Sequence, residues 1–132
     1  MAGASGADNR PLSPHLSVWR WHVTMASSIL HRATGIGLYA AAIGLVLWLM
    51  AAAAGPDAYA PIGLILSEWY GQTALYLLIA ALAYHLANGV RHLVFDFGLG
   101  MKLADADASA WFAILFSVVA PIGLWLLLGF GT

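Results

Sequence analysis

The chain has 132 residues, of which 62% are hydrophobic and only 8% are charged. A soluble domain carries roughly a quarter charged residues, so this composition argues against a water-soluble globule. The net charge of −1 provides no excess of the clustered cations that nucleic-acid binding needs, which excludes nucleic acid as a partner. Because the sequence contains no cysteine, it also excludes disulfides, thiolate metal sites and iron–sulfur ligation on this chain.

The chain begins with a segment, residues 1–9, that is rich in Gly, Ala and Ser. We expect this tail to be disordered and residues 10–132 to form one membrane domain, which opens with a short amphipathic interfacial segment. A cleaved signal peptide is not expected, because the first apolar run comes late and is too long for a signal h-region. The tail lacks the repeated arginines of a mitochondrial transit peptide and retains Met1. We therefore expect a bacterial inner (cytoplasmic) membrane rather than a mitochondrial one.

Three long stretches carry no Asp, Glu, Lys or Arg. They cover residues 33–56, 69–90 and 108–132. Each is longer than the ~20 residues that a membrane-spanning helix needs, and helices satisfy their own backbone hydrogen bonds in lipid whereas open strands do not. The sequence therefore predicts an all-α membrane protein. Its three transmembrane helices are expected near residues 30–53, 70–93 and 110–130, with a turn region at Gly55–Pro61.

The lysines and arginines are distributed unequally between the ends of these helices. Arg10, Arg20 and Arg32 precede or open the first helix, and Arg91 and Lys102 border the second loop. The first loop, residues 55–68, holds neither Lys nor Arg. By the positive-inside rule, the N-terminus and the second loop lie in the cytoplasm.

Two histidines lie on the second predicted helix. His85 and His92 are seven residues apart and therefore share one helix face, which Asn88 joins. If Arg91 marks the cytoplasmic boundary, His85 lies about 9 Å deeper and inside the hydrocarbon. His85 is either an interhelical hydrogen-bonding residue or an axial ligand of haem iron. Small residues one turn away on either side, Ala81 and Gly89, leave space for a flat macrocycle, but the same spacing also mediates helix packing.

One chain cannot supply both axial ligands from this helix, because His85 and His92 project from the same face. His31 is the other candidate near the bilayer, but its place beside Arg32 puts it about two helical turns shallower than His85, nearer the level of haem propionates. The second ligand is therefore expected from another chain.

Ser28, His31 and Arg32 share one face at the start of the first helix, through i+3 and i+4 spacing. Arg32 could be a topology anchor and Ser28 a helix cap. Alternatively, the three residues form a polar pocket that hydrogen-bonds a quinone carbonyl or a haem propionate. The spacing does not choose between these interpretations.

Other polar residues have simpler interpretations. Asp96 is expected to be a solvated loop charge or a local partner of Arg91, and His15 and His22 are expected to be solvated surface residues. The third helix carries Ser117 as its single intramembrane polar group and is expected to be lipid-facing scaffold.

Four segments together resemble a known family. They are RPLSPHL at residues 10–16, SILHRATG at 28–35, YHLANGVRH at 84–92 and DFG at 96–98. This set is similar to the cytochrome b membrane-anchor subunit of succinate dehydrogenase, respiratory complex II, over residues 10–98. His22 departs from the family pattern, in which many relatives have proline.

The resemblance implies a three-helix anchor that pairs with a second small membrane subunit and docks the iron–sulfur and flavoprotein subunits, which carry the iron–sulfur clusters and FAD. It implies that His85 ligates haem b, whose other ligand comes from the second anchor subunit. By the same resemblance, Ser28 and Arg32 help to bind ubiquinone, and His31, Arg32 and His92 lie around the haem propionates. No succinate oxidation is expected on this chain itself.

Three alternatives remain open at this stage. The chain could be a fumarate reductase anchor, since the direction of the reaction depends on subunits outside it. It could be a structural anchor without haem. It could also be a small transport subunit that uses His85, Asn88 and His92 as a polar track, although residues 69–83 offer few polar groups to continue that track.

Overall fold

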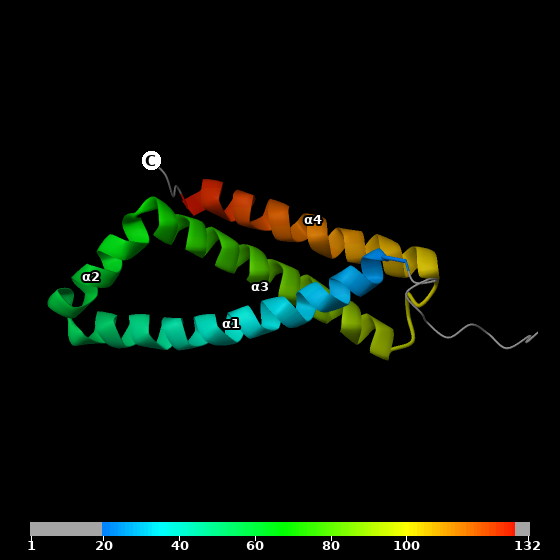
Figure 1. Cartoon of the computed structure of the whole chain (residues 1–132), viewed down its shortest axis with the longest axis horizontal. Coiled ribbons are helices and arrows are strands. Elements are labelled where there is room, and N and C mark those ends of the chain that lie inside the picture. Colours follow the sequence, from blue (N-terminus) through cyan, green and yellow to red (C-terminus); the bar gives the residue numbers. More distant parts are fainter. Residues whose placement is uncertain (1–19, 129–132) are drawn as a thin grey trace, which may run out of the picture.

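The computed structural model describes residues 20–128, so the expected disordered tail and His15 lie outside the described residues. All regular structure in this range is helical (Figure 1). The helices are α1 (Val23–Ala54), α2 (Pro56–Ser67), α3 (Trp69–Asp96) and α4 (Leu103–Leu128).

Within the described part of the chain, α1, α3 and α4 are long and apolar enough to cross a membrane. The predicted all-α fold with three spanning helices is therefore confirmed. Two helices begin earlier than predicted, α1 at Val23 instead of near residue 30 and α4 at Leu103 instead of near residue 110. The reason is that an uncharged stretch marks only the part of a helix within the hydrocarbon, whereas backbone hydrogen bonding continues through the polar turns outside it.

The predicted turn region at Gly55–Pro61 is wrong, because α2 occupies most of it. Gly55 reverses the chain with φ of 109°, a value that glycine adopts without strain. Pro56 then begins α2, a position where its missing N–H costs no helical hydrogen bond. The start of α3 lies so close to α2 that a Cβ on Gly71 would collide with the carbonyl oxygen of Ile65. The segment in which glycine and proline suggested a loop is therefore a helix. It begins at Pro56 and packs closely against α3 at Gly71.

The helix α3 contacts each of the other three helices (Figure 1). α4 runs alongside α3, whereas α1 lies against α3 at the end where α1 begins and diverges from it toward α2. The fully buried side chains are few and mostly small or polar, and many large apolar side chains are exposed. This pattern fits helices whose outer faces meet lipid or other membrane subunits instead of water.

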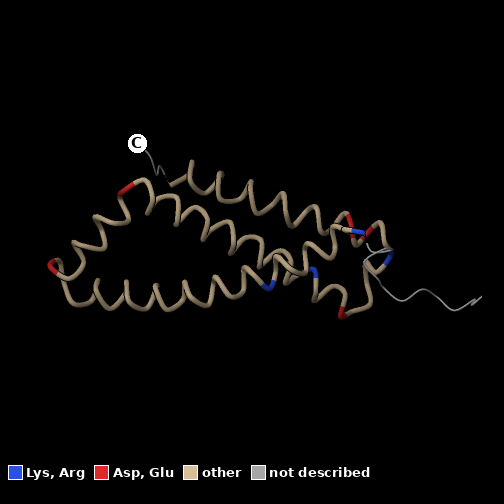
Figure 2. The backbone as a smooth tube through the Cα atoms, viewed as in Figure 1, with Lys and Arg blue, Asp and Glu red and all other residues tan. Residues whose placement is uncertain are grey.

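Charged residues gather at the two ends of the helices, and all described lysines and arginines lie toward one of them, together with Asp96, Asp105 and Asp107 (Figure 2). The described lysines and arginines are Arg20, Arg32, Arg91 and Lys102, and they lie toward the end where α1 begins. The opposite end, around α2, carries only the acidic residues Asp57 and Glu68 among the described charges. The predicted cytoplasmic location of the N-terminus rests on this distribution of lysines and arginines, and it stays a prediction.

Candidate functional site

Three histidines meet where α1 lies against α3. The rings of His31 and His85 are stacked, with centroids 3.9 Å apart and an angle of 11° between their planes. The ring of His92 lies 5.3 Å from that of His31 and is tilted by 54°. The structure thus brings together the three histidines that the sequence analysis placed around a haem.

The predicted depth difference between His31 and His85 is wrong, since their rings are in contact. That prediction took Arg32 and Arg91 as markers of one membrane boundary. In the structure α1 begins nine residues before Arg32, and Arg91 is only 8% exposed. Neither arginine therefore marks the edge of the helices.

The stacked pair does not have the geometry of two ligands on one iron. Two imidazoles that bind one iron from opposite sides hold the metal between their ring nitrogens, whereas rings stacked 3.9 Å apart are in van der Waals contact. Among the described residues, no group of three His, Cys, Asp or Glu side chains is arranged to hold a metal ion. The stacked pair therefore does not supply both axial ligands of one iron.

Two small residues of α1 shape the position of His85, and the sequence analysis assigned neither a role. The hydroxyl Oγ1 of Thr34 lies 3.2 Å from Nδ1 of His85. A Cβ on Gly35 would lie 3.1 Å from Cε1 of the same ring. Their spacing of three and four residues from His31 is the signal that could have found them, because it puts them on the same face of α1.

Several features of this cluster fit a planar haem-like group. The Nδ1 atom of His31 is buried and has no hydrogen-bond partner among the described residues, so it is available to a polar group of a ligand. A Cβ on Gly89, one turn from His85, would meet nothing within 4 Å, so the side of α3 beside the histidine is open. The hydrogen bond of His85 uses Nδ1, which leaves Nε2 without a hydrogen-bond partner among the described residues.

Ser28 and Arg32 lie beside the histidines on α1. The Nε and Nη2 atoms of Arg32 lie 3.4 Å from the carbonyl oxygen and the hydroxyl of Ser28, respectively. Arg32 is exposed, so a molecule outside this chain can reach its guanidinium. The suggested role of Ser28 as a helix cap is wrong, because α1 begins at Val23 after His22.

A buried hydrogen-bond network lies next to the histidine cluster and joins α1 to α3. The hydroxyl of Ser27 donates to Oδ1 of Asn88 at 2.8 Å, and the hydroxyl of Tyr84 donates to the carbonyl oxygen of Ser27 at 2.7 Å. Ser27 and Asn88 are fully buried. Asn88 was expected on the face of His85, but its partner Ser27 was missed, as was the bond from Tyr84 to Ser27.

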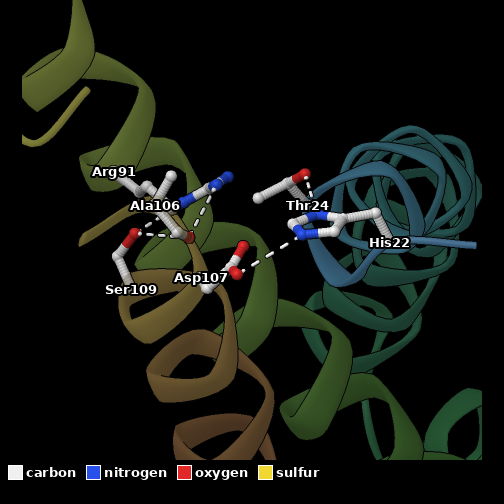
Figure 3. Close-up of polar contacts among 6 residues, drawn as sticks. All are labelled: His22, Thr24, Arg91, Ala106, Asp107 and Ser109. Atoms are coloured by element: carbon white, nitrogen blue, oxygen red, sulfur yellow. Dashed lines mark hydrogen bonds and ion pairs between the residues drawn. The ribbon is translucent and has the colours of Figure 1, made fainter. Parts of the chain in front are cut away.

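Arg91 extends this network to α4 (Figure 3). Its Nη1 donates to Oδ1 of Asn88 at 3.3 Å, its Nε to the hydroxyl of Ser109 at 2.9 Å, and its Nη2 to the carbonyl oxygen of Ala106 at 3.1 Å. Its guanidinium also lies over the ring of Phe95, 4.6 Å from the centroid. Arg91 therefore pairs with groups on α3 and α4, and the suggested local pairing with Asp96 is not among these contacts.

α4 is more than a lipid-facing scaffold, as Figure 3 shows at its first turns. Besides its contacts to Arg91, it supplies Asp107, whose Oδ2 lies 3.3 Å from Nε2 of His22. Ala110 and Ala113 are buried, which lets α4 approach its neighbours closely. The expectation of a solvated His22 is therefore wrong in part, because this side chain links the start of α1 to α4 although 42% of it is exposed.

A second feature lies far along α1 from the histidines. An apolar cavity of about 630 Å³ opens between α1, α2 and α3, and its lining includes Trp48 and Tyr59. None of the predicted site residues lines this cavity.

The fold and the site define a class of protein: a helical membrane protein with a histidine cluster between two candidate membrane-spanning helices, beside a serine–arginine pair whose arginine is exposed. The family model described as "Succinate dehydrogenase/Fumarate reductase transmembrane subunit" matches residues 6–124. The chain belongs to this family. The resemblance read from the sequence motifs is thereby confirmed.

Individual relatives agree with the family match. The chain is 40% identical over 114 residues to the succinate dehydrogenase cytochrome b556 subunit of Paracoccus denitrificans, covering 86% of this chain and 88% of that one. It is 38% identical over 121 residues to the human mitochondrial cytochrome b560 subunit, covering 88% and 70%. It is 34% identical over 118 residues to the b556 subunit of Rickettsia bellii, covering 89% and 92%.

Proposed function

We propose that this chain is the haem b-binding anchor subunit of a succinate:quinone oxidoreductase, with His85 as one axial ligand of the haem. The observation that carries the proposal is the packing of His85 at the α1–α3 contact, where Nδ1 is hydrogen-bonded to Thr34 and Nε2 has no hydrogen-bond partner among the described residues. The stacking of His31 on His85 is not the geometry of two ligands on one iron, which supports a second ligand from another chain. The other ligand is therefore assigned to a second small membrane-anchor subunit.

The bound haem would accept and release one electron at a time, at a potential tuned by its surroundings. This chain contributes polar groups around it. His31 offers a buried, unpartnered Nδ1, and His92 lies against His31. Together with Arg32, these groups would bind the propionates, because their donors suit carboxylates.

Ser28 and Arg32 would form part of the ubiquinone site. The long contacts of 3.4 Å between them cost little to exchange for shorter bonds to a quinone oxygen. Fixed donors in a site of low dielectric stabilise the negative charge that develops on that oxygen as electrons arrive. Ser28 would thus orient the quinone head group, and Arg32 would stabilise its reduced form.

The catalytic partners would be a flavoprotein subunit with FAD and an iron–sulfur subunit, docked at the end of the helices that carries the lysines and arginines. Succinate would be oxidised on the flavoprotein and not on this chain. The relatives described above are named as succinate dehydrogenase subunits, which favours this direction over a fumarate reductase anchor. The similarity to a Paracoccus protein supports a bacterial inner membrane.

The experiment that tests this function isolates the complex through an affinity tag on this chain. The expected preparation contains three co-purifying subunits, shows a low-spin b-type spectrum in a dithionite-reduced minus oxidised difference measurement, and reduces a ubiquinone analogue with succinate. A preparation with neither haem nor dehydrogenase subunits would contradict the proposal. In that case the structural and transport alternatives would be preferred.

A further inference from the structure

The hydroxyl of Thr34 lies between three polar atoms. Its Oγ1 is 2.8 Å from the carbonyl oxygen of Leu30 and 3.0 Å from the carbonyl oxygen of His31, both on the preceding turn of α1. The same atom is 3.2 Å from Nδ1 of His85 on α3. Among the described residues, Thr34 is the hydrogen-bond partner of His85.

A threonine hydroxyl has one hydrogen to donate and two lone pairs that accept. The carbonyl oxygen of Leu30 is the nearest of the three atoms and can only accept, so we assign the hydroxyl hydrogen to it, as is usual for threonine inside a helix. The oxygen of Thr34 is therefore an acceptor toward His85. It follows that Nδ1 of His85 carries the ring hydrogen and that Nε2 carries the free lone pair.

The same contacts hold the plane of the ring. His31 is stacked on one face of His85, and the backbone of Gly35 approaches its Cε1 edge so closely that a Cβ would lie 3.1 Å away. With one face and one edge occupied, the hydrogen bond to Thr34 sets the remaining rotation of the imidazole.

We propose that Thr34 is a positioning residue that fixes the tautomer and the orientation of His85 so that its Nε2 is the iron-binding atom. This proposal rests on the proposed role of His85 as haem ligand. An acceptor on the non-ligating N–H makes an imidazole more basic. A more basic ligand stabilises ferric relative to ferrous iron, so Thr34 also lowers the midpoint potential of the haem.

The test replaces Thr34 by valine, which keeps the shape of the side chain and removes the hydroxyl. Loss of such a partner typically weakens metal binding by about 10- to 100-fold. If ferric binding is weakened about tenfold more than ferrous binding, the midpoint potential rises by about 59 mV, the tenfold interval for one electron. Redox titration of the purified complex measures this shift, and haem retained after detergent washing measures the loss of affinity.

Two further variants isolate the hydroxyl. Thr34→Ser restores it and is expected to return the potential to the wild-type value. Thr73→Val is the matched control, because within the described part of the chain the hydroxyl of Thr73 bonds only inside its own helix, to the carbonyl oxygen of Trp69 at 2.8 Å. It is expected to leave the potential unchanged.

A Thr34→Val complex with the wild-type potential and haem content would overturn the proposal, as would a Thr34→Ser complex that behaves like the valine variant. Thr34→Ala removes the hydroxyl without adding an atom and gives the same test if the valine variant does not assemble. Failure of the proposed function is separately visible, because His85→Ala would then retain its haem.

Discussion

Replacing Gly35 by alanine should lower haem occupancy without weakening the helix. The added Cβ would lie 3.1 Å from Cε1 of His85, about 0.3 Å inside the 3.4 Å limit of ordinary contact. The ring cannot move away freely, because His31 is stacked on it and Thr34 is hydrogen-bonded to it. Ligating groups must be held within about 0.5 Å of their productive geometry. A shift of a few tenths of an ångström is therefore expected to weaken haem binding by about tenfold, the low end of the range for disturbed ligand support.

The assay compares haem content per complex and thermal stability for Gly35→Ala and Gly37→Ala. Gly37 is the matched control, since a Cβ there would meet nothing within 4 Å. Alanine is about 1 kcal/mol more favourable than glycine inside a helix, so neither change should lower the stability of α1 itself. Equal haem content in the two variants would refute the inference that Gly35 makes room for His85.

Three further predictions concern the polar groups around the histidines. Asn88→Leu removes the shared acceptor of Ser27 and Arg91, so the complex should lose about 1–3 kcal/mol of stability; an unchanged melting temperature in detergent would argue against the network. Arg91→Lys keeps the charge but not the planar fork that reaches three acceptors, and should reduce the amount of assembled complex in membranes. Ser28→Ala should raise the KM for a ubiquinone analogue roughly 2- to 12-fold, as expected for one lost hydrogen bond of about 0.5–1.5 kcal/mol, while the haem spectrum stays unchanged; an unaltered KM would remove Ser28 from the quinone site.

The spanning helices could be predicted because lipid imposes a simple requirement, a long uncharged stretch. The α2 helix could not, because glycine and proline mark turns in most sequences. Here Gly55 reverses the direction of the chain and Pro56 is the first residue of the next helix, so both residues belong to the start of a helix. Whether a glycine–proline pair marks a loop or the start of a helix depends on whether the residues after it pack against another element. Here they do, because α2 lies in close contact with Gly71 of α3.

Within the candidate site, helix periodicity placed His85, Asn88 and His92 on one face, since that requires only the rotation per residue. Helix periodicity could not predict the contacts between different helices. The stacking of His31 on His85 depends on how α1 crosses α3, and counting residues from Arg32 gave the wrong depth. Thr34 was missed for the same reason, because its partner lies 51 residues away in sequence.

The most direct test of the central claim is the reduced-minus-oxidised difference spectrum of the complex that carries His85→Ala, purified through this chain. The expected result is loss of the b-type signal while the flavoprotein and iron–sulfur subunits still co-purify. His22→Ala serves as the matched control, because this histidine contacts Thr24 and Asp107 outside the cluster and its removal should leave the signal in place. An unchanged haem content in the His85→Ala complex would contradict the assignment of His85 as the ligand.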